Sequence, residues 1–130
     1  MRGIIIRKLH ANYVSASEAG GEFFQVLFEE NQSENEDEYV STDKYFLIQR
    51  QFEFPDNGEC YIETQEPSEC GEFLISFSKL SRDKFCIQLP EQPSKWEISF
   101  ETDDDNFEEV KRILKIILSA PNHLVLGDIR

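Results

Sequence analysis

Three consecutive aspartates, Asp103 to Asp105, form the densest group of potential metal ligands in the sequence. Carboxylate oxygens suit Ca²⁺, but a loop of the EF-hand type also needs a glycine at its sharp turn, and the segment TDDDNFEE contains none. The same aspartates stand directly before a segment with helical periodicity, where they would accept hydrogen bonds from the free N–H groups of the first turn. We therefore predict a helix cap and no metal site.

Nucleophilic catalysis would need a base beside a serine, threonine or cysteine, and no motif in the sequence places one there. The two histidines, His10 and His123, stand at opposite ends of the chain, and the GxSxG motif is absent. The three cysteines, Cys60, Cys70 and Cys86, are odd in number and lack the CxxC spacing of zinc and redox sites. We expect free thiols that are buried or half-buried, and we predict no catalytic residue and no cofactor.

The net charge of the protein indicates which classes of partner it can attract. Thirteen basic residues stand against 26 acidic ones, which gives a net charge of −13. Such a field repels phosphate, and nucleic-acid binding rests on basic side chains that displace counterions, so we expect no nucleic-acid partner. A basic protein would instead be attracted and would associate faster. A second interpretation stays open, because an acidic surface also serves solubility alone.

The segment YFLIQRQF at 45–52 begins as an apolar strand and then turns polar. Alternation places Arg50 on the same face as Phe46 and Ile48, so its stem would pack on apolar neighbours while its guanidinium reaches a carboxylate. Glu63 lies in the next predicted strand, across the turn PDNG. We predict a cross-strand pair of Arg50 and Glu63, which contributes about 1 kcal/mol or less if it is exposed.

Alternation of apolar and polar residues dominates the first hundred positions and predicts β-strands with one apolar face. The predicted strands are 22–28, 45–52, 60–64, 72–78, a strand with Phe85, Ile87 and Leu89, and a strand with Trp96, Ile98 and Phe100. The turn-forming segments PDNG, SKLSRD and LPEQPS separate them, and such short connections favour antiparallel neighbours. The simplest topology is an antiparallel meander sheet of about six or seven strands.

The pattern changes to helical spacing after Thr102. The segment DDDNFEEVKRILKIILSA places apolar residues from Phe107 to Ile117 on one side of a helix, and Pro121 stops it. We predict an amphipathic helix at about 104–119 that packs on one face of the sheet, since neither apolar surface stays exposed. The tail after it is a candidate for a short last strand. The predicted fold class is α+β, in a single domain over 1–130, and exposed strand edges leave monomer and homodimer as alternatives.

No segment predicts a signal peptide or a membrane span. The apolar run GIII at 3–6 is followed at once by Arg7, Lys8 and His10, and no run approaches the length of a membrane-spanning helix. We therefore expect a cytoplasmic protein with no membrane partner.

Residues 29–43, EENQSENEDEYVSTD, form a polar and acidic segment that is longer than most strand connections. Long loops often bind partners, whereas a run of charge in a soluble protein is often only a solvated surface. Both interpretations stay open.

Four segments, in their order, resemble one protein family. They are KYFLIQRQFEF, ECYIETQEPSECGEF, LISFSKLSRDKFCIQL and WEISF, the last followed by the amphipathic helix. The order is similar to that of the immunity protein 10 family of bacterial polymorphic toxin systems, over about 21–118. The most specific parts are the YxLIQR run at Tyr45–Arg50 and YIE at Tyr61–Glu63, with Gly71 downstream. The chain departs from the family pattern at Glu72, where many members carry a second glycine.

The resemblance implies an α+β immunity protein that binds a toxin encoded beside it and protects the producing bacterium without catalysis. A net charge of −13 suits a basic target, and nuclease toxins tend to be basic because their substrate is a polyanion. The contact candidates are acidic, first Glu34, Glu36, Asp37 and Glu38 in the 29–43 loop, and second Asp103, Asp104 and Asp105. The alternative is an acidic binding or chaperone-like module for another basic protein, and an adjacent toxin gene would favour immunity.

Overall fold

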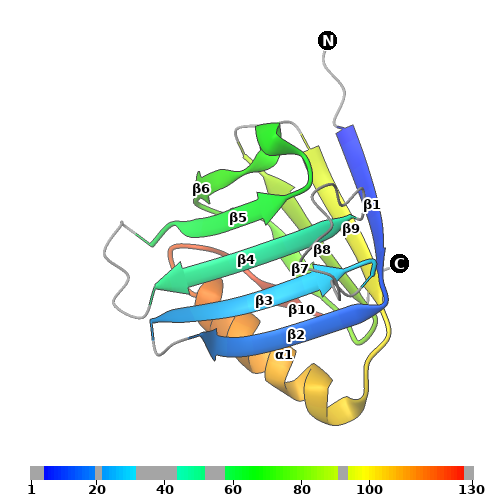
Figure 1. Ribbon diagram of the computed structural model, residues 1–130. Helices are drawn as coiled ribbons and strands as arrows, with labels where there is room; N and C mark the ends of the chain where they lie inside the picture. Colours follow the sequence, from blue (N-terminus) through cyan, green and yellow to red (C-terminus); the bar gives the residue numbers. More distant parts are fainter. Residues whose placement is uncertain (1–4, 20–21, 32–43, 52–57, 91–93, 128–130) are drawn as a thin grey trace.

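The structure is a computed structural model that describes residues 5–19, 22–31, 44–51, 58–90 and 94–127 of the 130-residue chain. Within these ranges it contains ten strands, one 3₁₀ turn and one α-helix. The strands form two five-stranded sheets. The sheets stack face to face, and one lies in front of the other in Figure 1.

The sheet in front, which we call the meander sheet, is built from strands that follow one another in sequence order. Each strand is antiparallel to the next. The strands are β2 (Tyr13–Ala19), β3 (Phe23–Glu29), β4 (Tyr45–Gln51), β5 (Cys60–Thr64) and β6 (Gly71–Phe73). The 3₁₀ turn η1 (Pro67–Glu69) connects β5 and β6.

The second sheet, which we call the mixed sheet, combines parallel and antiparallel pairs. In spatial order its strands are β1 (Ile5–Ala11), β9 (Ser94–Phe100), β8 (Lys84–Leu89), β7 (Ser78–Leu80) and β10 (Val125–Leu126). The strands β7, β8 and β9 are antiparallel neighbours, whereas β1 pairs parallel with β9 and β10 pairs parallel with β7. The short strand β10 is the last strand that the sequence suggested.

The α+β class and the C-terminal helix are confirmed, but the prediction of a single meander sheet is wrong. The predicted strand at 72–78 is split, because β6 ends at Phe73 in one sheet and β7 begins at Ser78 in the other. Ile75 in the crossing is buried, whereas Phe77 is 39% exposed. The predicted apolar row of Phe73, Ile75 and Phe77 therefore holds as far as Ile75 and breaks at Phe77, where Ser78 is buried instead. The strand β7 also takes the first half of the segment SKLSRD, which the sequence predicted as a turn.

Aromatic rings join the two sheets in the core. Phe28 and Phe46 of the meander sheet meet Phe85 and Trp96 of the mixed sheet, and all four are fully buried. The ring centroids of Phe28 and Phe85 lie 5.6 Å apart, and those of Phe46 and Trp96 lie 5.3 Å apart. Burial of each ring contributes about 1.5–3 kcal/mol, and each aromatic pair adds about 0.5–1.5 kcal/mol. The sheets are therefore coupled through one core.

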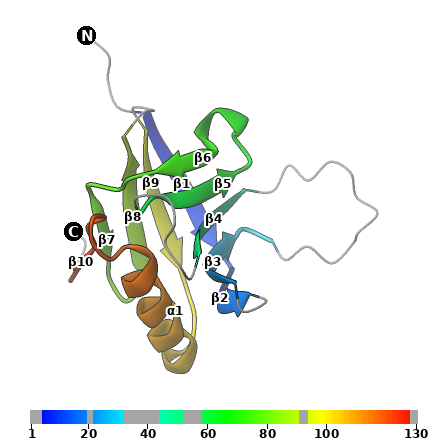
Figure 2. The same cartoon turned by 90° about the vertical axis from the view of Figure 1, so that its left-hand side faces the viewer.

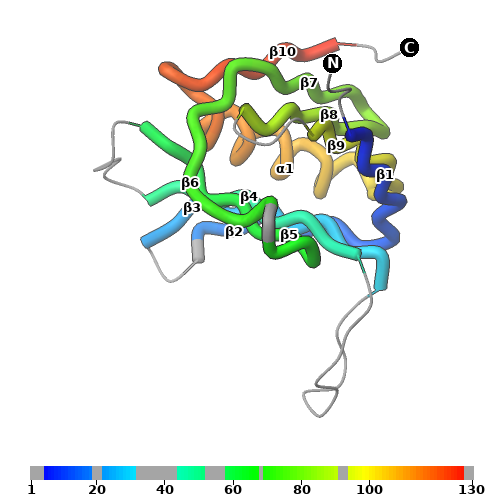
Figure 3. Tube along the Cα trace, turned by 90° about the horizontal axis from the view of Figure 1, so that it is seen from above, coloured from blue at the N-terminus to red at the C-terminus, as the bar shows by residue number. Residues whose placement is uncertain are grey.

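The helix α1 (Asp104–Ile117) follows β9 and agrees with the predicted helix at about 104–119. It begins at its cap Asp103, whose carboxylate accepts a hydrogen bond from the backbone N–H of Asn106 at 2.7 Å. The helix contacts β2, β3 and β4, and both Figure 2 and Figure 3 show it between the two sheets. Its buried residues are Val110, Ile113, Leu114 and Ile117.

The chain after α1 is fixed to other segments by the buried side chain of Asn122. Its Nδ2 donates to the carbonyl of Gly58 at 2.7 Å, and its Oδ1 accepts from the N–H of Ile75 at 2.8 Å. Gly58 lies two residues before β5 and has a φ of 86°, which favours glycine. A Cβ at this position would also collide with the ring of Pro121. The junction therefore requires glycine for two separate reasons.

Candidate functional site

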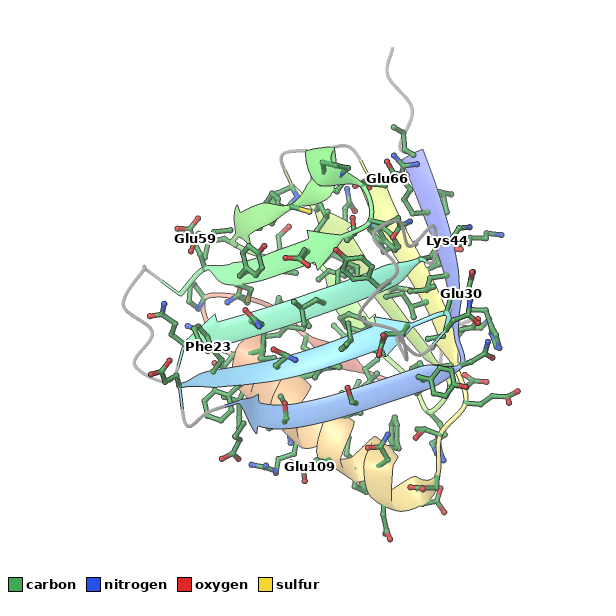
Figure 4. All side chains as sticks on the ribbon, viewed as in Figure 1. Phe23, Glu30, Lys44, Glu59, Glu66 and Glu109 are labelled. Atoms are coloured by element: carbon green, nitrogen blue, oxygen red, sulfur yellow. The ribbon has the colours of Figure 1, made fainter. Side chains whose placement is uncertain are left out.

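The outward side of the meander sheet is the clearest candidate for a binding surface. Five half-buried residues of three adjacent strands point away from the core there, and we call them the tyrosine face: Leu27 of β3, Tyr45 and Leu47 of β4, and Tyr61 and Glu63 of β5. The strand register places Leu27, Leu47 and Glu63 in one row across the sheet. Figure 4 shows this side of the molecule. Within the described residues, no helix or strand packs over it.

Two tyrosines of this face are held by one carboxylate. The hydroxyl of Tyr45 donates to Glu63 Oε2 at 2.9 Å, and the hydroxyl of Tyr61 donates to Glu63 Oε1 at 2.9 Å. Burial, and then the hydrogen bond to Glu63, raises the pKa of Tyr45 to about 12. The hydrogen bond to Glu63 is the largest cause that raises the pKa of Tyr61. Both hydroxyls therefore stay protonated at neutral pH, and both rings have a fixed orientation.

Glutamates lie at the border of the tyrosine face. Figure 4 shows Glu59 at the start of β5, Glu66 beyond the end of β5, and Glu30 beyond the end of β3. Across the meander sheet, the described residues that point outward include no lysine and no arginine. Figure 4 also shows Lys44 beside Glu30, so the border is charged and mainly acidic. An aromatic and aliphatic centre within a polar border is the usual arrangement of a protein–protein interface.

The four acids that the sequence favoured as contacts, Glu34, Glu36, Asp37 and Glu38, lie outside the described residues. The base of their loop is described. The backbone N–H of Glu30 donates to the carbonyl of Lys44 at 3.0 Å and brings the ends of the loop together. Lys44 directly precedes Tyr45. The loop therefore begins and ends at the border of the tyrosine face.

The second group of predicted contacts is placed elsewhere. Asp103 caps α1, and Asp104 forms an ion pair with Arg82 at 2.8 Å. Asp105 is exposed in the first turn of the helix. Because α1 packs on the inner side of the meander sheet, these aspartates do not join the outward tyrosine face. The capping role that the sequence indicated for this group is the one that the structure shows.

The structure does not form the predicted pair of Arg50 and Glu63, because the two side chains point to opposite sides of the sheet. Arg50 points inward and is 4% exposed. Its Nη1 donates to the carbonyl of Ile117 at 3.0 Å and to Ser119 Oγ at 3.1 Å. The carbonyls at the C-terminal end of a helix favour a cation. Arg50 therefore fixes the end of α1 to the meander sheet, which explains why a charge extends an apolar row.

The remaining histidine, serine and cysteine side chains form no reactive triad or metal site within the described residues. The structure brings His10 and Ser99 together, with Nδ1 and Oγ 2.9 Å apart on the paired strands β1 and β9. No motif in the sequence indicated this proximity. The three cysteines are free; Cys60 and Cys86 are buried, and Cys70 is half-buried, as predicted. In the described part of the chain, no three His, Cys, Asp or Glu side chains converge to hold a metal ion.

The described residues also contain no helix of the length and apolarity needed to cross a membrane. In comparisons with known proteins, neither a protein-family model nor a curated protein matches the sequence. Membership of the immunity protein 10 family therefore stays a prediction from the segments quoted above.

Proposed function

We propose that this protein is an immunity protein that binds and neutralises a basic toxin in the cytoplasm of the producing cell, with the tyrosine face at the centre of the contact. The resemblance in sequence supports the first part. The observation that supports the second is the surface itself, with tyrosine and leucine at its centre and glutamates at its border. Binding alone would block a toxin, so the proposal requires no catalytic group.

The centre of the face has the properties of an energetic anchor. Interface energy usually concentrates in a few aromatic side chains that become fully desolvated. Tyr45 and Tyr61 already have their hydroxyls fixed by Glu63, so little side-chain entropy is lost when a partner orders them. Leu27 and Leu47 pair directly across β3 and β4 and supply apolar area beside the rings.

The border contributes mainly to the rate of association. Glu30, Glu59 and Glu66 add to a net charge of −13 and would attract a basic toxin over a distance of about 8–10 Å at physiological salt. The two ends of the 29–43 loop lie beside Tyr45. We therefore propose that the acids of this loop extend the border. Association should therefore slow as salt concentration rises, while dissociation depends mainly on the tyrosines.

The test uses the toxin encoded by an adjacent gene and measures its affinity by calorimetry. Tyr45→Ala and Tyr61→Ala should each weaken binding about 30-fold or more, because loss of an aromatic anchor costs about 2 kcal/mol or more. The control Phe77→Ala removes a 39% exposed ring on the side of the mixed sheet and should change the affinity by less than about threefold. A loss as large in Phe77→Ala as in Tyr45→Ala would place the contact elsewhere.

A second experiment compares the two acidic regions by charge. The double variant Glu30→Gln/Glu59→Gln should slow association at low salt, and most of that difference should disappear at high salt. Glu101→Gln/Asp105→Asn removes the same charge beside the helix start, outside the proposed contact, and should have a smaller effect. If the second variant slowed association more, the contact would lie at the aspartates of α1.

The same surface would serve the alternative function, an acidic binding or chaperone-like module for another basic protein. Growth of cells that express the adjacent toxin separates the two. Rescue by the wild-type chain, lost in Tyr45→Ala/Tyr61→Ala, is the result expected for immunity. Tight binding to a different basic protein, with no rescue, would favour the alternative.

A further inference from the structure

The outward side of the mixed sheet differs from the rest of this acidic protein because lysines gather there. We call the group Lys8 of β1, Lys79 of β7, Lys84 of β8 and Lys95 of β9 the lysine face. The buried residues of β8 and β9 alternate with these positions, so the lysines point away from the core. They account for four of the 13 basic residues in the chain.

Among the described residues, these lysines form no ion pairs. In the described part of the chain, carboxylates within 4.0 Å are found for Arg7, Arg82, Lys111 and Arg112, and for none of the four lysines. The four ion-paired side chains neutralise nearby acids, whereas the exposed Lys44 and Lys115 resemble the lysine face in having no such carboxylate within the described residues. On the lysine face, Lys95 Nζ lies over the Phe77 ring, 5.8 Å from its centroid. The face therefore differs from the isolated lysines by bringing several ammonium groups, each with three N–H donors, to one surface.

A cavity of about 490 Å³ lies on this face and has the size of a small-molecule site. Lys8, Lys84 and Lys95 line it, with Glu97 as the single acidic residue. His10 and Ser99 add an imidazole and a hydroxyl to the same wall.

The floor of the cavity adds no further negative charge. The thiol of Cys86 also lines the cavity, and burial raises its pKa, so it stays neutral at physiological pH. Three lysines against one glutamate give the cavity a positive charge within an acidic molecule.

We propose that this cavity binds a compact anion with two or more phosphate groups. Lysine binds phosphate as a point charge with several donors, and three lysines around one cavity match a ligand with several charged oxygens. A long polyanion fits less well, because it would extend over surface where the net charge of −13 repels it. A small ligand lies within a Debye length, about 8 Å, of the lysines and is screened from distant acids.

The test is a titration of the free protein with inorganic pyrophosphate and, separately, with ATP, both without Mg²⁺ at physiological ionic strength, followed by NMR of the backbone amides. Saturable shifts should be confined to β1, β8 and β9. Equal affinity for the two probes would show that phosphate groups alone are bound. An affinity at least about tenfold higher for ATP would show that the ligand is a nucleotide. No toxin is present, so the result does not depend on the proposed immunity function.

Three variants decide whether the shifts report this cavity. Lys84→Ala/Lys95→Ala should weaken binding at least about tenfold, because the loss of even one charge-assisted hydrogen bond costs about tenfold. Lys44→Ala/Lys115→Ala removes two exposed charges outside the lysine face and should leave the affinity within about twofold. Glu97→Gln removes the acid of the cavity and should tighten binding.

The proposal fails if no saturable shift occurs at about 10 mM of either probe, a concentration above the millimolar range of weak specific sites. It also fails if both double variants weaken binding equally, since the shifts would then report net charge only. Binding of an acidic protein on this face, with neither probe bound, would likewise overturn it.

Discussion

The outer sides of the two sheets differ in charge although their inner sides are built alike. In both sheets, alternate apolar side chains point into one shared core, where the ring of Phe46 packs on that of Trp96. Outside, the meander sheet shows tyrosine, leucine and glutamate, whereas the mixed sheet shows lysines around a cavity. A net charge of −13 is therefore a sum over unlike surfaces. The net charge determines the electrostatic field far from the protein, but it does not describe the local charge that a ligand contacts at either face.

The two outer faces belong to one folding unit only if both sheets unfold together, and Phe85→Ala tests this with the largest expected effect. Phe85 is fully buried on β8 and meets rings of both strands β3 and β4. Its removal should lower the free energy of unfolding by about 3–5 kcal/mol. In urea, the fluorescence of Trp96 and far-UV circular dichroism should still change together. Separate transitions would mean that the faces belong to independent units.

The control for this variant is Gln88→Ala on the same strand. Gln88 points outward and is half-buried. Its replacement should change the free energy of unfolding by about 0.5 kcal/mol or less. A larger loss would show that the outer side of the mixed sheet contributes to folding and not only to binding.

A smaller effect is expected at the glycines that join each sheet to the C-terminal segment. Gly58→Ala should destabilise the protein by about 1–3 kcal/mol or more, because the residue has a positive φ and the new Cβ meets Pro121. Gly127 also has a positive φ, 154°, but a Cβ added there would meet only Lys79 Cε at 3.8 Å. Gly127→Ala should therefore destabilise the protein less than Gly58→Ala. Thermal unfolding of both variants measures the difference. Equal losses would mean that the collision at Pro121 relaxes without cost.

The strands β1 and β2 were not predicted, because their segments IIRKLHA and YVSASEA lack a clear apolar row, but β3, β4, β5, β8, β9 and α1 were predictable from their period of two or of a helix. The assignment of strands to sheets was not. Phe73 ends β6 and Ile75 lies in the crossing at 74–77, yet both are buried at alternate positions, so the sequence pattern does not show where the chain leaves the sheet. The parallel pairing of β1 with β9 joins residues about 90 positions apart, and no local signal reports it.

The candidate sites were predictable only in part. The sequence placed Tyr45 and Leu47 on one face of a strand, but it directed attention to acids and not to rings. It paired Arg50 with Glu63 because opposite charges on neighbouring strands suggested a contact, whereas the strand register and α1 decide where each side chain points. The lysine face arises from four strands that the chain brings together, so its members are scattered in sequence from 8 to 95.

The smallest expected effect concerns the hydroxyl of Tyr45. Its pKa is raised from 10.0 to about 12, so the folded state holds this proton more tightly than the unfolded chain. The resulting stability is complete below pH 10 and is lost as pH rises through about 12. Compared with wild type, Tyr45→Phe should therefore show a shallower loss of unfolding free energy between about pH 10 and pH 12. An unchanged slope would mean that burial and the hydrogen bond to Glu63 do not raise the pKa of this hydroxyl in the folded state.

The most direct test of the central claim is growth of cells that express the toxin that we propose is encoded beside this protein, together with variants of each face. The two variants are Tyr45→Ala/Tyr61→Ala on the tyrosine face and Lys84→Ala/Lys95→Ala on the lysine face, both confirmed as folded by circular dichroism. We predict that the first loses protection and that the second protects as well as wild type. Full protection by the tyrosine variant, or its loss only in the lysine variant, would contradict the proposed function of the meander sheet.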